Sequence, residues 1–95
     1  MFNLSILTSQ GVYYKGQAAG VIAPGADGYL EILVNHASLI TVLKEGDLVV
    51  INQDRKELSY RITGGFLEVH QNQVSLLADK IEILEGPHII VSGLT

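Results

Sequence analysis

The sequence predicts an all-β fold, an antiparallel β-sandwich of about ten short strands. Apolar and polar residues alternate along several segments, which is the period of a strand with one face on a core. Turn-forming residues separate these segments at short intervals, as in sandwiches and barrels. No segment of ten or more residues has the apolar stripe of a helix; the nearest, 34–44, lacks a clean stripe and ends before Gly46.

Each expected strand follows from its own pattern. Residues 57–63 alternate without exception, with polar residues at odd positions. Residues 2–6 and 73–78 repeat the alternation of polar and apolar residues, and 81–83 begin another short one. The segments 47–51 and 88–91 are more continuously apolar, which is typical of strands covered on both faces. The expected turns cover 9–11, 24–28, 44–47, 52–55, 64–65, 71–72 and 85–87. The Gly64-Gly65 pair predicts a bulge or a close backbone approach between strands.

Composition limits the possible functions. The chain has 95 residues, enough for one small domain, and its 47% apolar content is ordinary for a globular protein. The net charge of -4 and the six scattered basic residues argue against a nucleic-acid partner. Without cysteine there is no disulfide, thiol catalysis or cysteine-ligated zinc. No apolar stretch is long enough to cross a membrane, so no direct membrane insertion is expected, and the first residues do not resemble a secretory signal.

Catalytic and metal-binding patterns are sparse. The three histidines, His36, His70 and His88, lack metal-ligand spacing, and we expect His70 and His88 to be surface positions on strands. No glycine-rich phosphate loop occurs. Ser38 has only His36 as a neighbouring base, without an acidic partner, and the strand carboxylates are Glu31, Glu68 and Glu82. We therefore expect no catalytic residue, no metal and no cofactor.

Three segments carry a family resemblance. Residues 24–41, PGADGYLEILVNHASLIT, resemble the signature of the epsilon subunit of F-type ATP synthases. Residues 63–79, TGGFLEVHQNQVSLLAD, resemble the second hallmark of that family. Residues 4–11 with Tyr14-Lys15-Gly16 resemble its first hairpin. Because order and separation also agree, the resemblance covers about residues 2 to 79.

The resemblance implies a non-catalytic rotor subunit in the central stalk of the ATP synthase. Such a subunit couples proton-driven rotation of the c-ring to the gamma subunit and thereby to ATP synthesis on the alpha/beta hexamer, which it meets only indirectly. It implies a peripheral protein on the cytoplasmic face of a bacterial inner membrane, or on the stromal or matrix face in an organelle. Residues 1–79 would form the epsilon-type sandwich, and residues 80–95 an extension with one or two short strands.

The resemblance also assigns interface residues. Thr8, His36 and Thr41 match family positions at the gamma interface. The expected c-ring contact consists of Asp27, Gly28, Tyr29 and Glu31. The competing interpretations are that Tyr29 packs within its own sandwich and that His36 only orders its loop.

The sequence departs from the family pattern at several positions. Tyr29 stands where an acidic residue is usual, and Val34-Asn35 replaces a Pro-Gly pair. Ser38 replaces a proline, so the loop should be less rigid, although Asn35 can adopt the left-handed conformation of the family's glycine. The family's C-terminal helical hairpin is not found in residues 80–95. We therefore expect neither inhibition by an extended helical arm nor ATP sensing.

Two other functions fit parts of the same pattern. One is a small ligand-binding or regulatory β-sandwich module outside the ATP synthase. The other is a small enzyme that uses His36 and nearby carboxylates. Co-purification with gamma would favour the stalk subunit, and a lone monomer that binds a metabolite would favour the module.

Overall fold

The computed structural model describes residues 1–85 and confirms the all-β class. The strands are β1 (Phe2–Thr8), β2 (Gly11–Gly25), β3 (Gly28–Ile32), β4 (Leu39–Leu43), β5 (Gly46–Asn52), β6 (Glu57–Ile62), β7 (Gly65–His70), β8 (Gln73–Ala78) and β9 (Ile81–Glu85). Residues 1–85 contain no helix. Accordingly, this part of the chain offers no helix that is long and apolar enough to span a membrane. The strand expected at 88–91 lies outside the described residues.

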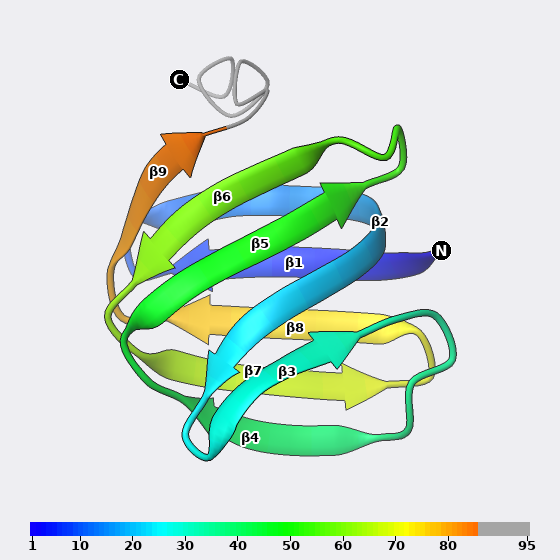
Figure 1. Cartoon of the computed structure of the whole chain (residues 1–95), viewed down its shortest axis with the longest axis horizontal. Helices are drawn as coiled ribbons and strands as arrows, with labels where there is room; N and C mark the ends of the chain where they lie inside the picture. The colour runs from blue at the N-terminus through cyan, green and yellow to red at the C-terminus, as the bar shows by residue number, and fades with distance from the viewer. Residues whose placement is uncertain (86–95) are drawn as a thin grey trace.

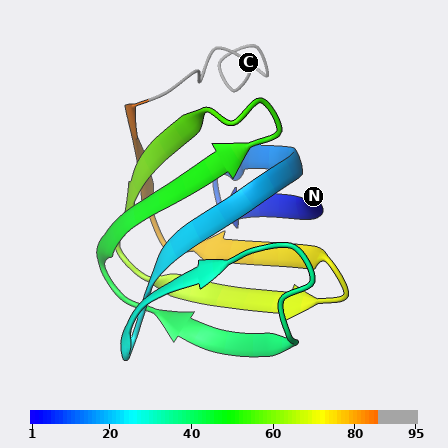
Figure 2. The same cartoon turned by 45° about the vertical axis from the view of Figure 1, so that its right-hand side comes forward.

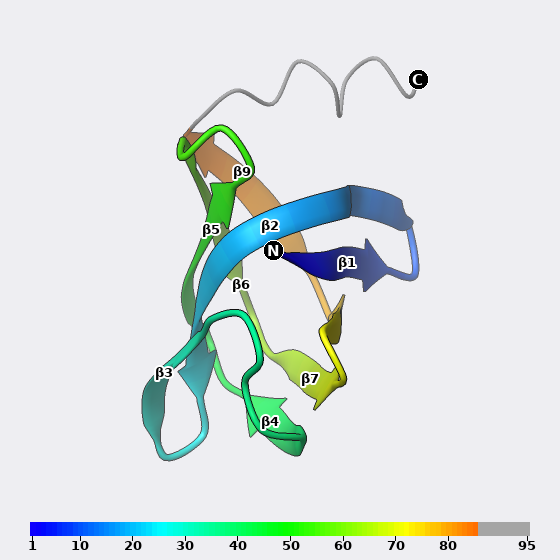
Figure 3. The same cartoon turned by 90° about the vertical axis from the view of Figure 1, so that its right-hand side faces the viewer.

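The strands form two layers that share the long strand β2 (Figure 1). The first half of β2 pairs with β1, and its second half pairs with β3 and β5. The back layer in Figure 1 therefore contains β1, β8, β7 and β4 beside the start of β2. The front layer contains β3, the end of β2, β5, β6 and β9. Figure 3 shows β2 curving from one layer into the other.

Alternating side chains of both layers meet in one core. The buried apolar residues on β1 are Phe2, Leu4 and Ile6, and every second residue of β6, β7 and β8 is buried in the same way. Tyr60 is the largest fully buried side chain. The alternation expected for residues 57–63 and 73–78 is thus confirmed, because the even-numbered residues of both strands face the core.

Gly65 marks the closest backbone approach in the back layer. Its φ is 151°, a value that L side chains rarely adopt. A Cβ added at Gly65 would lie 2.1 Å from the carbonyl oxygen of Leu77 and 2.9 Å from the Cα of Ala78. The close approach predicted for Gly64-Gly65 is confirmed, and it lies where β7 begins to pair with β8.

Some features differ from the sequence expectation. β1 and β8 pair in parallel, whereas every other strand pairing is antiparallel among residues 1–85. The outer face of β5 is only half covered, because Val49 and Ile51 are half-buried rather than enclosed. The short strand expected at 81–83, in contrast, is confirmed: residues 81–85 form β9, which pairs antiparallel with β6 in the front layer.

Candidate interaction surface

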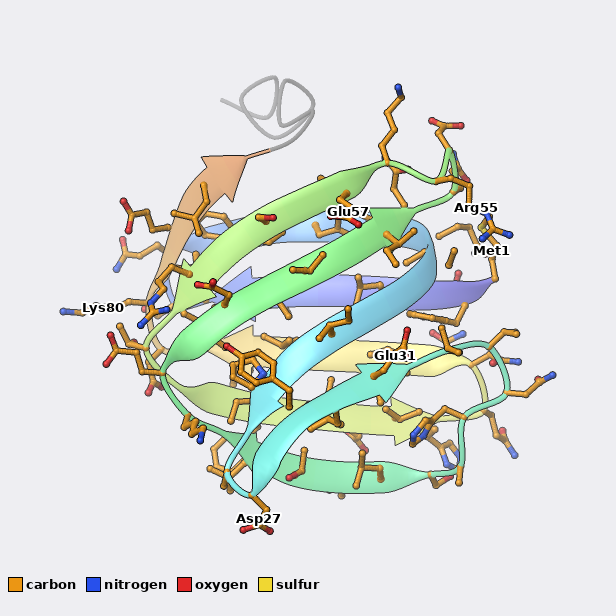
Figure 4. The ribbon with its side chains drawn as sticks, in the orientation of Figure 1. Met1, Asp27, Glu31, Arg55, Glu57 and Lys80 are labelled. Atoms are coloured by element: carbon orange, nitrogen blue, oxygen red, sulfur yellow. The ribbon has the colours of Figure 1, made fainter. Side chains whose placement is uncertain are left out.

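The four residues expected at the c-ring lie on one hairpin, β2–β3. Pro24 pairs with Tyr29 and Gly25 with Gly28, so Ala26 and Asp27 form a two-residue turn. Figure 4 shows Asp27 at the tip of this hairpin and Glu31 further along β3. All four expected residues are exposed. The fold therefore brings this set together on a single local element.

The hydroxyl of Tyr29 is held by a hydrogen bond, while the residue as a whole remains 57% exposed. The backbone N–H of Asp47 donates a hydrogen bond to the Tyr29 hydroxyl at 3.0 Å. A Cβ at Gly46 would lie 2.7 Å from the Cβ of Pro24 and 2.8 Å from the Tyr29 hydroxyl oxygen, so only glycine fits there. Tyr29 thus lies on the outer face of the sandwich and ties the hairpin to β5, instead of packing in the core.

Arg61 lies beside this anchor and links two acidic side chains. Its guanidinium is 3.0 Å from an Asp47 carboxylate oxygen and 3.4 Å from one of Glu45. Hydrogen bonds to Asp47, and then to Glu45, raise the pKa of Arg61 above its ordinary value. All three side chains are substantially exposed, so solvent screens these pairs and they add little stability.

The three residues expected at gamma do not form one cluster. Thr8 ends β1, Thr41 lies within β4, and His36 lies in the loop before β4. Pairing through β8 and β7 places Thr8 and the His36 loop at opposite ends of the back layer. Thr8 is only 8% exposed, and its hydroxyl accepts a hydrogen bond from the Gln10 N–H at 2.9 Å. Thr41 is half-buried and pairs with the core residue Leu67.

His36 is half-buried in the loop between β3 and β4. The backbone N–H of His36 donates a hydrogen bond to the carbonyl oxygen of Leu33 at 3.2 Å, and the ring Nδ1 of His36 lies 2.7 Å from the carbonyl oxygen of Ala37. Asn35 precedes it with a φ of 63°, so the left-handed conformation predicted for this asparagine is confirmed. The imidazole is therefore oriented by its own loop and still reaches solvent.

The outer face of the back layer carries an apolar row that the sequence analysis missed. Adjacent strands contribute one residue each, and the register places these side by side: Val12, Leu7, Leu77, Phe66 and Val42. Their exposed fractions are 41%, 36%, 53%, 55% and 52%. With strands about 4.8 Å apart, the apolar row runs for about 19 Å across five strands. Ile40 extends it at the β4 edge and is 74% exposed.

The same face becomes polar towards its other end. The next residues along the strands include Glu68, Ser75 and Ser5, which the register places opposite one another. Beyond them His70 pairs with Gln73, and Gln73 with Asn3. An exposed apolar group bordered by polar residues is the usual composition of a protein-binding surface. The clue in the sequence was Leu77, an apolar residue at a position that the alternation assigns to solvent.

His70 is exposed at the end of β7, as expected, whereas His88 lies outside the described residues. Within residues 1–85, no group of three or more histidine, aspartate or glutamate side chains is arranged to hold a metal ion. The features of residues 1–85 that suit contact with a protein partner are the β2–β3 hairpin, the His36 loop and the apolar row.

Comparison with known proteins identifies the family of this chain. The family described as "ATP synthase, Delta/Epsilon chain, beta-sandwich domain" matches residues 1–84. The chain belongs to this family. This confirms the resemblance read from residues 2–79, and the sandwich named in the family description is the fold seen in residues 1–85.

Individual ATP synthase epsilon chains are similar over most of this sequence. The ATP synthase epsilon chain of Protochlamydia amoebophila (strain UWE25) is 42% identical over 85 residues, which cover 90% of this chain and 58% of that protein. The ATP synthase epsilon chain of Chlorobium limicola is 40% identical over 80 residues, or 84% of this chain and 91% of that protein. The chain thus spans less than two thirds of the first relative and nearly all of the second.

Solved structures support the fold. A chain from the Euglena gracilis mitochondrial ATP synthase (OSCP/F1/c-ring) superposes with a TM-score of 0.80 at 22% identity, covering 96% of this chain and 59% of that one. A chain from the Tetrahymena thermophila mitochondrial ATP synthase central stalk and c-ring gives a TM-score of 0.71 at 18% identity, covering 84% and 64%. At this identity, the likeness shows a shared sandwich fold.

Proposed function

We infer that this chain works as an epsilon-type subunit of an F-type ATP synthase, a non-catalytic rotor component of the central stalk. In this role it couples proton-driven rotation of the c-ring to the gamma subunit, while ATP synthesis takes place on the alpha/beta hexamer. The observation that carries the proposal is the family match over residues 1–84. The exposed apolar row supports it, since such a surface is suited to permanent cover by another subunit.

The proposal assigns one surface to each partner. The gamma subunit covers the outer face of the back layer, including the apolar row, and meets His36 beside it. Thr8 and Thr41 have side chains on the inner side of the same layer, so gamma meets them only at the end of β1 and at the β4 edge. The c-ring meets the β2–β3 hairpin through Asp27, Gly28, Tyr29 and Glu31. The protein is then peripheral to the membrane, on the cytoplasmic face in a bacterium or on the stromal or matrix face in an organelle.

Cysteine crosslinking tests the gamma assignment, because the chain has no cysteine of its own. Single cysteines at positions 8, 36 and 41 are each placed in an assembled complex with gamma. We expect the strongest crosslink from position 36, and weaker crosslinks from position 41, which lies on the inner side of β4, and from position 8, which is almost wholly buried. If all three positions fail to crosslink to gamma, the assignment of these residues is wrong.

Tyr29 tests the c-ring assignment. Replacing Tyr29 with alanine removes the exposed ring, and we expect attachment to the c-ring to weaken about tenfold, since aromatic side chains are common interface anchors. The measurement is binding of the assembled complex to c-ring-containing membranes. The control is Tyr29→Phe, which keeps the ring and loses only the hydrogen bond from Asp47. Unchanged attachment of Tyr29→Ala, together with lower thermal stability, would show that the ring serves its own fold only.

A further inference from the structure

The His36 loop is fastened to a turn that is distant in the sequence. The backbone N–H of Asn35 donates a hydrogen bond to Oδ1 of Asn72 at 2.7 Å. In return, Nδ2 of Asn72 donates to Oδ1 of Asn35 at 3.0 Å. Figure 2 shows the loop that follows β3 lying beside the turn between β7 and β8. Both polar atoms of the Asn72 side chain are therefore used to hold Asn35.

The backbone of Asn72 is fixed independently of this contact. Gln71 and Asn72 form the two-residue turn between β7 and β8, with φ values of 49° and 60°. Two positive φ values indicate a type I′ hairpin turn, which favours asparagine and glycine. The carbonyl oxygen of Asn72 also accepts a hydrogen bond from the Asn3 N–H at 2.9 Å, which holds the turn against β1. The turn itself would accept glycine, so its geometry does not require the Asn72 side chain.

A second contact joins the loop to β7. Ser38 Oγ and His70 Nδ1 lie 3.2 Å apart, within hydrogen-bond distance. The loop is thus held on both sides of His36, by Asn35 before it and by Ser38 after it. Residues 34–38 belong to no strand, so these side-chain contacts replace the ladder hydrogen bonds that fix the strands.

We propose that Asn72 is a positioning residue that holds the His36 loop in the conformation that docks on gamma. This rests on the proposed function, in which His36 contacts gamma. A loop that is already ordered loses less conformational entropy when its partner binds, and its affinity is higher for that reason. The less rigid loop expected from the sequence stays a prediction, and the Asn35–Asn72 pair is a constraint that the loss of the family's prolines does not remove.

The test uses Asn72→Gly in the full chain. Glycine keeps the positive φ of the turn and removes both hydrogen bonds to Asn35. We expect the variant to stay folded, its amide hydrogens at residues 33–38 to exchange faster, and its affinity for purified gamma to fall about tenfold. Asn35→Gly loses only the bond that Asn72 Nδ2 donates, so its affinity should fall by less. Exchange is followed by NMR and affinity by calorimetry.

The matched control is Gln71→Gly. It changes the neighbouring position of the same turn, where φ is also positive and the side chain makes no hydrogen bond within residues 1–85. This control should bind gamma like the unaltered chain. Equal affinity of Asn72→Gly and the unaltered chain would overturn the inference while leaving the proposed function intact. Failure of the unaltered chain itself to bind gamma would instead contradict the proposed function, and the inference with it.

Discussion

Replacing Gly65 with alanine is expected to unfold most of the protein. The new Cβ would lie 2.1 Å from the carbonyl oxygen of Leu77, and that atom cannot move away without breaking the pairing of β7 with β8. The positive φ adds backbone strain of about 1–3 kcal/mol. We expect a loss of more than about 4 kcal/mol in the free energy of unfolding. Small domains have only about 5–15 kcal/mol in total, so little folded protein would remain.

Gly11→Ala is the matched control for this substitution. Gly11 has a similar φ of 144°, but a Cβ there would meet nothing within 4 Å. The Gly11→Ala variant should therefore lose only the free energy of unfolding that corresponds to the backbone strain, about 1–3 kcal/mol. Chemical denaturation gives the free energy of unfolding of both variants, and the difference between them is the cost of the steric clash at Gly65 beyond the backbone strain. Equal losses for the two variants would contradict the close approach at Gly65.

Converting the centre of the apolar row to polar residues is expected to abolish binding to gamma. Phe66 and Leu77 are cross-strand neighbours and are each more than half exposed. In the double variant Phe66→Thr/Leu77→Thr, threonine keeps a good strand former at both positions. The free energy of unfolding should change by less than about 1 kcal/mol, because the core is untouched. Affinity for gamma should fall at least about 100-fold, as for the loss of two interface anchors.

The control for the apolar row lies two residues away on the same strands and face. Glu68 and Ser75 are cross-strand neighbours on the polar part of this surface. Glu68→Thr/Ser75→Thr introduces the same residue type without removing an apolar side chain. We expect its affinity for gamma to change much less. If both double variants bind gamma as tightly as the unaltered chain, gamma does not cover the apolar row.

Much of the fold could be predicted from the sequence, because polar and apolar residues alternate along most strands. β6 and β8 follow the predicted pattern, with even residues inward. β2 was not foreseen as one strand of 15 residues, because it joins both layers and its burial pattern changes along its length. The parallel pairing of β1 with β8 also escaped prediction, since an alternating pattern does not record the direction of the neighbouring strand.

The candidate site was predictable only where its residues are local in sequence. Asp27, Gly28, Tyr29 and Glu31 share a hairpin, so short-range pairing already brings them together. The apolar row needs five strands in register, and no single segment contains it. In Leu76-Leu77, two adjacent apolar residues look alike in the sequence, yet only Leu76 faces the core.

The contacts of Asn72 were equally hidden. The turn at 71–72 was expected from its residue types, which favour positive φ. Its side-chain partner, Asn35, is 37 positions away in the sequence. Such a pair depends on how β7–β8 and the β3–β4 loop meet in the folded sandwich, which a local pattern does not encode.

The most direct test of the rotor-subunit proposal is purification of the tagged chain from its own cells in mild detergent. The bound proteins are identified by mass spectrometry and their amounts are compared. The proposal predicts gamma in equal amount with the chain, together with alpha, beta and the c subunit, and loss of gamma in the Phe66→Thr/Leu77→Thr variant. Recovery of the chain as a lone monomer, without gamma or the c subunit, would contradict it.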